Sequence, residues 1–204
     1  MKNPKLPSIC LIVSSKDIPE KLEIALKAGI RWIQYREKEL TRKDILANAF
    51  QVREITKRHD TLLTINDYLD IAIAVDADGV HLGQDDLPVE AAKKSFSGII
   101  GLSTHNLEEA IEAKEKGVHY IGFGPIFHTT TKKDAYQPRG YDMLSCICKK
   151  LDIPVLAIGG IKKRHLKELK ERGCRYLATS SGILDGEVKT NVEDFIKIFE
   201  LFSK

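Results

Sequence analysis

The sequence predicts one α/β domain over residues 1–204, a (β/α)8 barrel of the TIM-barrel class. Two observations predict it: a unit of short apolar run, polar turn and amphipathic stretch recurs along the chain, and no low-complexity or Pro/Gly-rich linker divides the sequence. About eight such units in a chain of this length are typical of the smallest barrels. An open doubly wound sheet is the alternative, but its first turn is normally glycine-rich, and Ser14–Asp17 contains no glycine.

The apolar runs are the predicted strands. They are short, rich in β-branched residues and almost continuously apolar, a pattern that indicates strands buried on both faces of a parallel sheet. In chain order we expect strands at Ile9–Val13, Trp32–Tyr35, Leu62–Ile65, Gly79–Leu82, Ile99–Leu102, Tyr120–Phe123, Val155–Ile158 and Tyr176–Ala178.

The amphipathic stretches between the runs predict helices. Thr41 with Asp44 forms a capping arrangement at the start of one helix, and Asn106 is a good N-cap for another. Gly117 and Gly173 stand where helices are expected to end. The predicted helices are Pro19–Ala28, Thr41–Lys57, Leu69–Val75, Leu107–Lys116, Lys162–Arg172 and Asn191–Phe202.

The composition limits the class of function. The 32 basic and 29 acidic residues give a formal net charge of +3, which does not suggest a protein that binds nucleic acid or a membrane surface. No apolar segment reaches the roughly 18 residues of a membrane span, and no signal-peptide pattern is present, so we expect a cytoplasmic protein. The cysteines are scattered, so reduced structural thiols are expected at Cys10, Cys146, Cys148 and Cys174.

Cations follow two of the predicted strands. Active sites of (β/α)8 barrels lie at the carboxyl ends of the strands. Arg36 and Lys38 leave the second strand two residues apart, so both side chains can point to the same side. Lys132 and Lys133 lie in the polar loop Phe127–Tyr136 after the sixth strand. Together these cations could neutralise a diphosphate; the alternative is that they are solvated surface charges.

Two carboxylates follow neighbouring strands. Asp67 comes after the third strand and Asp86 after the fourth. Adjacent parallel strands lie about 5 Å apart, so the two side chains could share one divalent ion. Mg²⁺ is usually held by one or two carboxylates together with substrate phosphates, which makes a metal-bridged pyrophosphate the favoured interpretation. The alternative is that Asp67 caps the helix Leu69–Val75.

Glycines and small hydroxyl residues follow the last two strands. Gly159 and Gly160 come after the seventh strand, and Ser180 and Ser181 after the eighth. The corresponding loops of these barrels commonly offer backbone N–H groups to a phosphate, and glycine allows a close approach. Two anion sites at one barrel mouth imply two phosphorylated substrates or one long bis-anionic substrate.

The histidines do not identify a nucleophile or a general base. We interpret His81 as a satisfied, partly buried residue in preference to a catalytic one, and His105 as a helix-cap or mouth residue. His128 lies in the loop after the sixth strand and could touch a ligand. GxSxG, HExxH and Walker motifs are absent from the sequence.

Six motifs, in order along nearly the whole chain, resemble the thiamine-phosphate synthase family. They are QYREK at Gln34–Lys38, IND at Ile65–Asp67, ADGVHLGQDD at Ala77–Asp86, GLSTH at Gly101–His105, GPIFHTTTKKDA at Gly124–Ala135 and AIGGI at Ala157–Ile161. The resemblance implies a TIM-barrel transferase that joins hydroxymethylpyrimidine diphosphate to a thiazole phosphate, with Mg²⁺ as cofactor and a homodimer as its assembly. The chain departs from the family pattern at His128, where the synthases usually carry proline, and at Thr179 and Ser180, which replace a more apolar pair.

Roles for individual residues also come from the resemblance. The pyrimidine diphosphate would be bound by Gln34, Arg36, Lys38, Asn66 and Lys132, with Ser103 beside the pyrophosphate. Mg²⁺ would be held by Asp67 and Asp86. The thiazole phosphate would be held by Thr129, Thr131, Gly160, Ser180 and Ser181.

Two other functions stay open at this point. One is the related thiazole tautomerase branch, whose members tend to lose the metal-binding acids and to carry a histidine in the loop after the sixth strand; here both acids are present and Pro125 stands where that histidine is expected. The other is a non-catalytic paralogue that only binds phosphorylated ligands, which would have no need of a metal pair to activate a leaving group.

Overall fold

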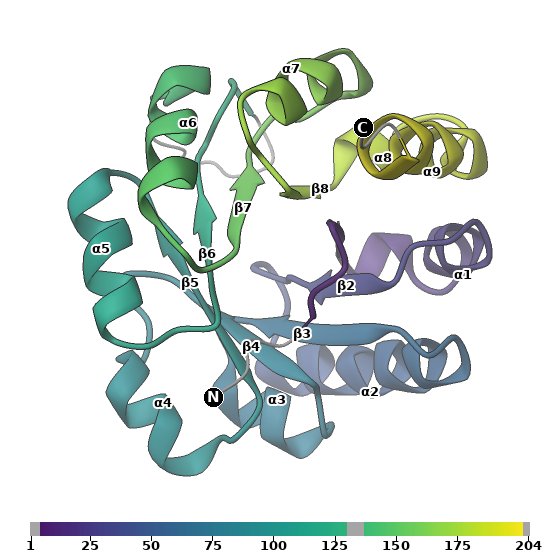
Figure 1. The fold of residues 1–204 in the computed structure, drawn as a ribbon. Coiled ribbons are helices and arrows are strands. Elements are labelled where there is room, and N and C mark those ends of the chain that lie inside the picture. The colour runs from purple at the N-terminus through teal and green to yellow at the C-terminus, as the bar shows by residue number, and fades with distance from the viewer. Residues whose placement is uncertain (1–4, 130–136, 202–204) are drawn as a thin grey trace.

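Eight parallel strands close into a barrel in the computed structural model, which describes residues 5–129 and 137–201. Each strand pairs with the next along the chain, and β8 pairs back onto β1 (Figure 1). The closed order confirms the predicted (β/α)8 barrel, so the open doubly wound alternative is wrong. The strands are β1 (Ile9–Val13), β2 (Trp32–Tyr35), β3 (Leu62–Asn66), β4 (Gly79–Leu82), β5 (Ile99–Thr104), β6 (Tyr120–Phe123), β7 (Val155–Ile158) and β8 (Tyr176–Thr179).

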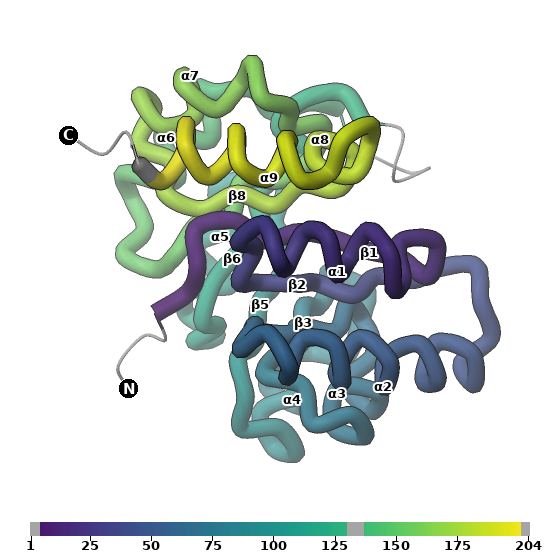
Figure 2. The backbone as a smooth tube through the Cα atoms, turned by 90° about the vertical axis from the view of Figure 1, so that its right-hand side faces the viewer, coloured from purple at the N-terminus to yellow at the C-terminus, as the bar shows by residue number. Residues whose placement is uncertain are grey.

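Helices cover the outside of the barrel (Figure 1). The C-terminal helix α9 contacts α1, so the ring of helices closes as the sheet does (Figure 2). The α-helices are α1 (Glu20–Lys27), α2 (Arg42–Arg58), α3 (Leu69–Ala74), α4 (Val89–Ser95), α5 (Leu107–Glu115), α6 (Gly140–Lys150), α7 (Leu166–Glu171), α8 (Ser181–Leu184) and α9 (Val188–Ile196). The 3-10 helices are Ser15–Asp17 and Lys163–His165, and Lys197–Leu201 forms a π-helix. None of the described helices has the length and apolarity needed to span a membrane.

Apolar side chains pack in two layers because successive residues of a strand point to opposite faces. Leu11 and Ile33 belong to the larger cluster, between strands and helices. Their neighbours Cys10 and Trp32 belong to a second cluster with Tyr120, which fills the inside of the barrel. The Trp32 and Tyr120 rings meet edge to face, with centroids 5.0 Å apart. The barrel is therefore packed below its mouth, at the carboxyl ends of the strands, where the active sites of this fold lie.

Local signals for the helix ends are confirmed. The Thr41 side chain accepts a hydrogen bond from the Asp44 N–H at the start of α2, and the Asn106 side chain accepts one from the Glu109 N–H at the start of α5. Gly117, just after α5, has a φ of 68°. A capping side chain or a glycine acts on the nearest backbone groups, so these ends are readable from sequence.

Several predicted ends are wrong. Strands β3, β5 and β8 run one or two residues further than predicted, because the polar residues Asn66, Ser103 and Thr179 keep the backbone pairing of the sheet. Helix α7 begins at Leu166 and not at residue 162, since the Lys162 N–H donates to Nδ1 of His165 and closes a tighter 3-10 turn first. Helix α9 begins at Val188, three residues before the predicted start.

Candidate active site

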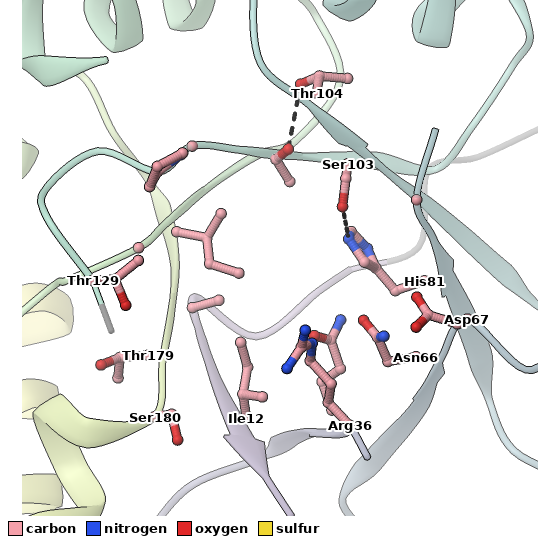
Figure 3. Close-up of a pocket in the computed structure, with 18 of the residues that line it drawn as sticks. Ile12, Arg36, Asn66, Asp67, His81, Ser103, Thr104, Thr129, Thr179 and Ser180 are labelled. Carbon is pink, nitrogen blue, oxygen red and sulfur yellow. Dashed lines mark hydrogen bonds between the residues drawn. The ribbon is translucent and has the colours of Figure 1, made fainter. Parts of the chain in front are cut away.

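A cavity of about 420 Å³ opens at the carboxyl ends of the strands. Figure 3 shows Arg36, Asn66 and Asp67 on one side of it and Thr129 and Ser180 on the other. All the predicted site residues that the structure describes line this cavity: Gln34, Arg36, Lys38, Asn66, Asp67, Asp86, Ser103, Thr129, Gly160, Ser180 and Ser181. Thr131 and Lys132 fall outside the described residues. The structure thus brings the described set together, while the role of each residue stays a prediction.

The two aspartates lie side by side at the ends of β3 and β4. The Asp67 N–H donates to the His81 carbonyl at 2.8 Å, which fixes its backbone at a φ of 65°. The Asp86 carboxylate accepts from the Gly83 N–H at 2.6 Å. Burial raises the pKa of Asp86, and its side-chain interaction with the Asp67 carboxyl raises it further. This is the response of two carboxyl groups that share one site.

The alternative role for Asp67 is wrong. The N-cap of α3 is Tyr68, and α3 receives no side-chain capping hydrogen bond there. The Asp67 side chain instead pairs with Lys38, whose Nζ lies 2.5 Å from Oδ2. The carboxylate is thus directed at the cations of the cavity and not at the helix behind it.

Arg36 and Lys38 lie at the cavity because the intervening Glu37 is held on the other side. The Arg36 N–H continues the β1–β2 pairing by donating to the Val13 carbonyl at 2.9 Å. The Glu37 carboxylate accepts from the Ser15 and Lys38 N–H groups at 3.1 and 3.0 Å. Burial opposes the charge of Glu37, but these hydrogen bonds outweigh burial and lower its pKa. An anchored Glu37 leaves both flanking cations on the cavity side of the chain, where Lys38 pairs with Asp67.

The opposite side of the cavity is made of backbone and hydroxyl groups. Gly159 and Gly160 have φ values of 99° and 64°, and a Cβ on Gly160 would lie 2.3 Å from the His128 carbonyl oxygen. Ser180 is the N-cap of α8 and makes no capping hydrogen bond with its side chain. The neighbouring Thr179 hydroxyl donates to the Ile161 carbonyl at 3.0 Å, which ties β8 to the loop after β7.

His81 and His105 take the positions that the sequence suggested, whereas His128 is not among the residues that line the cavity. His81 is buried, and both ring nitrogens are hydrogen-bonded, Nδ1 to the Tyr120 hydroxyl at 3.0 Å and Nε2 to the Ser103 hydroxyl at 2.9 Å. Burial lowers the pKa of His81 to about 4, so the ring is neutral near neutral pH. His105 is bonded to Glu109 in the first turn of α5 and lines the cavity. His128 is exposed.

Some residues at the cavity were not predicted. Ile12, Ile158 and Ala178 supply apolar surface between its two sides (Figure 3 labels Ile12). Gln84, expected at the rim after the fourth strand, makes a contact that was not predicted: it donates to the Ser103 carbonyl at 2.6 Å and supports that strand end. The last inward-facing residue of each strand would have predicted these positions. Which residues face inward can be assigned only when the register of the barrel is known.

The carboxylates of the cavity fit a divalent cation that is held partly by the protein and partly by a bound substrate. Among the described residues, no three His, Cys, Asp or Glu side chains gather in a way that could hold a metal by themselves. The Asp67–Asp86 pair therefore offers two carboxylates and leaves further positions to other oxygens, as magnesium sites at substrate phosphates do. The four cysteines are free, and Cys146 and Cys148 lie on α6 as unpaired thiols.

The chain is similar to known proteins over most of its length. A profile of the family described as thiamine monophosphate synthase matches residues 9–183. A thiamine-phosphate synthase of Persephonella marina is 43% identical over 195 residues, which cover 94% of this chain and 93% of that protein. One of Archaeoglobus fulgidus is 44% identical over 164 residues, covering 80% and 78%.

A solved structure gives the same result. A thiamine phosphate pyrophosphorylase from Pyrococcus furiosus superposes with a TM-score of 0.86 at 36% identity, covering 95% of this chain and 96% of that one. The match of fold and the match of sequence therefore extend over the same region, including the strand ends that line the cavity. The chain belongs to the thiamine monophosphate synthase family of transferases.

Proposed function

We propose that this chain joins hydroxymethylpyrimidine diphosphate to a thiazole phosphate, giving thiamine phosphate and pyrophosphate. The observation that carries the proposal is the division of one cavity into a side with cations and paired carboxylates and a side with backbone and hydroxyl groups. The names of the relatives support the same reaction. The first side suits a diphosphate that must leave, and the second suits a phosphate that stays in place.

The reaction needs little covalent chemistry from the protein. The bond between the pyrimidine methylene and the diphosphate oxygen breaks, and its electron pair leaves with pyrophosphate. The thiazole nitrogen forms the new bond to the methylene, so the substrate itself is the nucleophile. Arg36, Lys38 and Lys132 stabilise the departing charge, which grows as the bond breaks. Gln34 and Asn66 orient the pyrimidine diphosphate, and Ser103 adds a donor beside the pyrophosphate.

Mg²⁺ is the proposed cofactor, held by Asp67 and Asp86. The raised pKa of Asp86 supports this choice, because it reflects burial and a second carboxyl group that both oppose a further negative charge. A cation between the two groups would remove that opposition, and hard oxygen ligands favour Mg²⁺. When bound, the ion would supply charge neutralisation at the pyrophosphate.

The thiazole phosphate is assigned to the side formed by the loops after β6, β7 and β8. Its proposed ligands are Thr129, Thr131, Gly160, Ser180 and Ser181. Gly160 contributes through its backbone, since a side chain there would collide with the main chain of His128. Backbone and hydroxyl donors of this kind suit a phosphate that does not change charge during the reaction.

The test is incubation of the purified protein with each substrate alone and with both, followed by mass detection of the products. We expect thiamine phosphate and pyrophosphate only with both substrates and a divalent ion, and no turnover after chelation. Tautomerisation of the thiazole without coupling would select the tautomerase alternative. Binding of both ligands without any product would select the non-catalytic paralogue.

Three further assignments belong to the same proposal. Residues 1–204 form one barrel domain, and the protein acts in the cytoplasm, where the free thiols of the described chain would stay reduced. The assembly is a homodimer, as the family resemblance implies. Light scattering of the purified protein tests the dimer, and a mass of one chain would contradict it.

A further inference from the structure

Three side chains on neighbouring strands form a hydrogen-bonded row from the inside of the barrel to the cavity. The Tyr120 hydroxyl, on β6, lies 3.0 Å from Nδ1 of His81 on β4. Nε2 of His81 lies 2.9 Å from Oγ of Ser103 on β5 (Figure 3). Tyr120 is fully buried, His81 is 4% exposed, and Ser103 lines the cavity. The row ends on a residue predicted to stand beside the pyrophosphate.

Packing fixes the two rings in place. His81 and Tyr120 are stacked, with centroids 5.4 Å apart and planes 23° apart. The strands beside them carry glycine where the rings pass: a Cβ at Gly101 would lie 2.1 Å from the Tyr120 ring, and one at Gly122 would lie 2.9 Å from the His81 ring. Two glycines thus make room for a pair of polar rings in a position where apolar side chains would fill a barrel equally well.

The burial of Tyr120 bears on which nitrogen of His81 carries the proton, because a buried phenol needs an acceptor for its O–H. The Thr64 hydroxyl near it already accepts from Trp32 Nε1 and donates to the Ile33 carbonyl, both at 3.2 Å, whereas Nδ1 of His81 lies 3.0 Å from the Tyr120 hydroxyl. We take Nδ1 as the acceptor of the phenol proton, which places the ring proton on Nε2. Nε2 then donates to Ser103. In the opposite tautomer the phenol proton would have to go to the side chain of Thr64 or Gln34, both of which also interact with Tyr120.

We propose that His81 is a positioning residue for Ser103. Tyr120 holds the His81 ring, and Nε2 of that ring donates to the Ser103 oxygen. The Ser103 hydroxyl proton is then directed at an anionic oxygen of the substrate. Ser103 would otherwise rotate and could donate to His81 instead. A second proton on the ring would not alter this, because Nε2 would still donate. The proposal rests on the proposed function, since the oxygen that receives the Ser103 proton belongs to the leaving pyrophosphate.

The first test reads the tautomer without turnover. Nitrogen NMR of the uniformly ¹⁵N-labelled protein distinguishes a ring with Nε2 protonated from one with Nδ1 protonated. We expect the His81 signals of the Nε2-protonated form in the absence of substrate. Signals of the Nδ1-protonated form would overturn the proposal, and this outcome does not depend on whether the protein makes thiamine phosphate.

The second test is a double-mutant cycle between His81 and Ser103. His81→Leu removes the donor, and we expect kcat to fall about tenfold with little change in KM, as for loss of one hydrogen bond that matters in the transition state. In a Ser103→Ala background the same change should have less than about a twofold effect, because the two residues act as one unit. An equal loss in both backgrounds would show that His81 acts by another route.

The conservative variant His81→Gln separates positioning from packing. Its amide N–H can reach the place of Nε2, so we expect it to recover most of the kcat lost in His81→Leu. Circular dichroism and thermal unfolding monitor the fold of each variant. A His81→Gln protein that folds like wild type but is as slow as His81→Leu would overturn the proposal. An inactive wild-type protein with the expected tautomer would count against the proposed function alone.

Discussion

Three charged side chains meet at one side of the cavity, those of Asp67, Asp86 and Lys38. Lys38 pairs with Asp67, while the side chain of Asp86 interacts with Asp67 and keeps a hydrogen bond to Gly83. One cation therefore faces two carboxyl groups, and the raised pKa of Asp86 reflects burial and this shortage of positive charge. A divalent ion would correct the shortage and would also draw in a diphosphate.

Asp86→Asn tests this balance. It removes one negative charge with almost no change of shape, so the fold should survive while the ion loses a ligand. We expect turnover to fall on the order of 100-fold at a fixed Mg²⁺ concentration, and more Mg²⁺ to be needed for half-maximal rate. Initial rates across a Mg²⁺ titration give both quantities. Asp152→Asn is the matched control: this exposed aspartate pairs with Lys114 away from the cavity, so the variant should behave like wild type.

The buried His81 makes stability depend on pH. Its pKa falls from the ordinary 6.5 to about 4 on folding, because burial disfavours the charged ring. The unfolded chain therefore takes up a proton between these values and the folded chain does not, so stability is complete above 6.5 and is lost as the pH falls toward 4. Between about pH 7 and about pH 5 wild type should lose about 2 kcal/mol that His81→Gln does not lose. Urea unfolding at both pH values measures the difference; equal losses in the two proteins would contradict it.

At the scale of elements, the loop after β7 depends on contact with the loop after β6. The Phe127 N–H donates to the Gly159 carbonyl at 3.0 Å and the Ile126 N–H to the Ile158 carbonyl at 2.8 Å. These bonds hold the two loops in contact. Only glycine fits at position 160, because a Cβ there would collide with the His128 carbonyl oxygen. The side of the cavity that we propose for the thiazole phosphate is therefore shaped by backbone hydrogen bonds between the segments after β6 and β7.

Gly160→Ala should damage this side selectively. The new Cβ would meet the His128 carbonyl oxygen, at a backbone φ of 64° that side chains avoid, and neither group can move without shifting a loop. We expect KM for the thiazole phosphate to rise roughly tenfold, with a smaller change for the pyrimidine diphosphate. Gly173→Ala is the control: its φ of 89° is also unfavourable, but no atom lies within 4 Å of its Cβ. It should cost stability without changing either KM.

The elements also show which boundaries a sequence can predict. The caps at Thr41 and Asn106 were predicted because a side chain that bonds to a backbone group three residues away is a local event. The ends of β3 and β5 were not, because Asn66 and Ser103 are polar and belong to strands only through pairing with distant residues. Helix α8 is a single short turn, and four residues carry too little periodicity to predict it.

At the scale of the whole molecule, closure of the barrel creates the site. Residues as far apart in sequence as Gln34 and Ser181 line one cavity, because parallel strands all end at the same rim. The interior below the rim is filled by rings such as Trp32 and Tyr120, so a ligand bound at the rim cannot pass through the barrel. Because the rim exists only when the barrel is closed, a ligand that binds there stabilises the folded protein against the unfolded chain.

Ligand binding should accordingly stabilise the whole protein. Pyrophosphate and Mg²⁺ together, at about 100 times the dissociation constant, should add about 2.7 kcal/mol and raise Tm by roughly 5–10 °C. Either one alone should give a much smaller rise, because the ion needs phosphate oxygens and the phosphate needs the ion. Thermal unfolding by circular dichroism measures this, and equal shifts with and without Mg²⁺ would argue against a shared site.

The sequence by itself determined the barrel, most of its strands, the helix caps and the residues that gather at the rim, because the periodicity of burial and the motifs after each strand are local properties. Only the tertiary structure decided which of these residues touch. In the folded chain Lys38 pairs with Asp67, and the Asp86 side chain interacts with the same carboxyl group. The buried His81 ring is hydrogen-bonded to Ser103. Such contacts depend on strand register and on space left by distant glycines, and neither is recorded in the neighbouring residues of the chain.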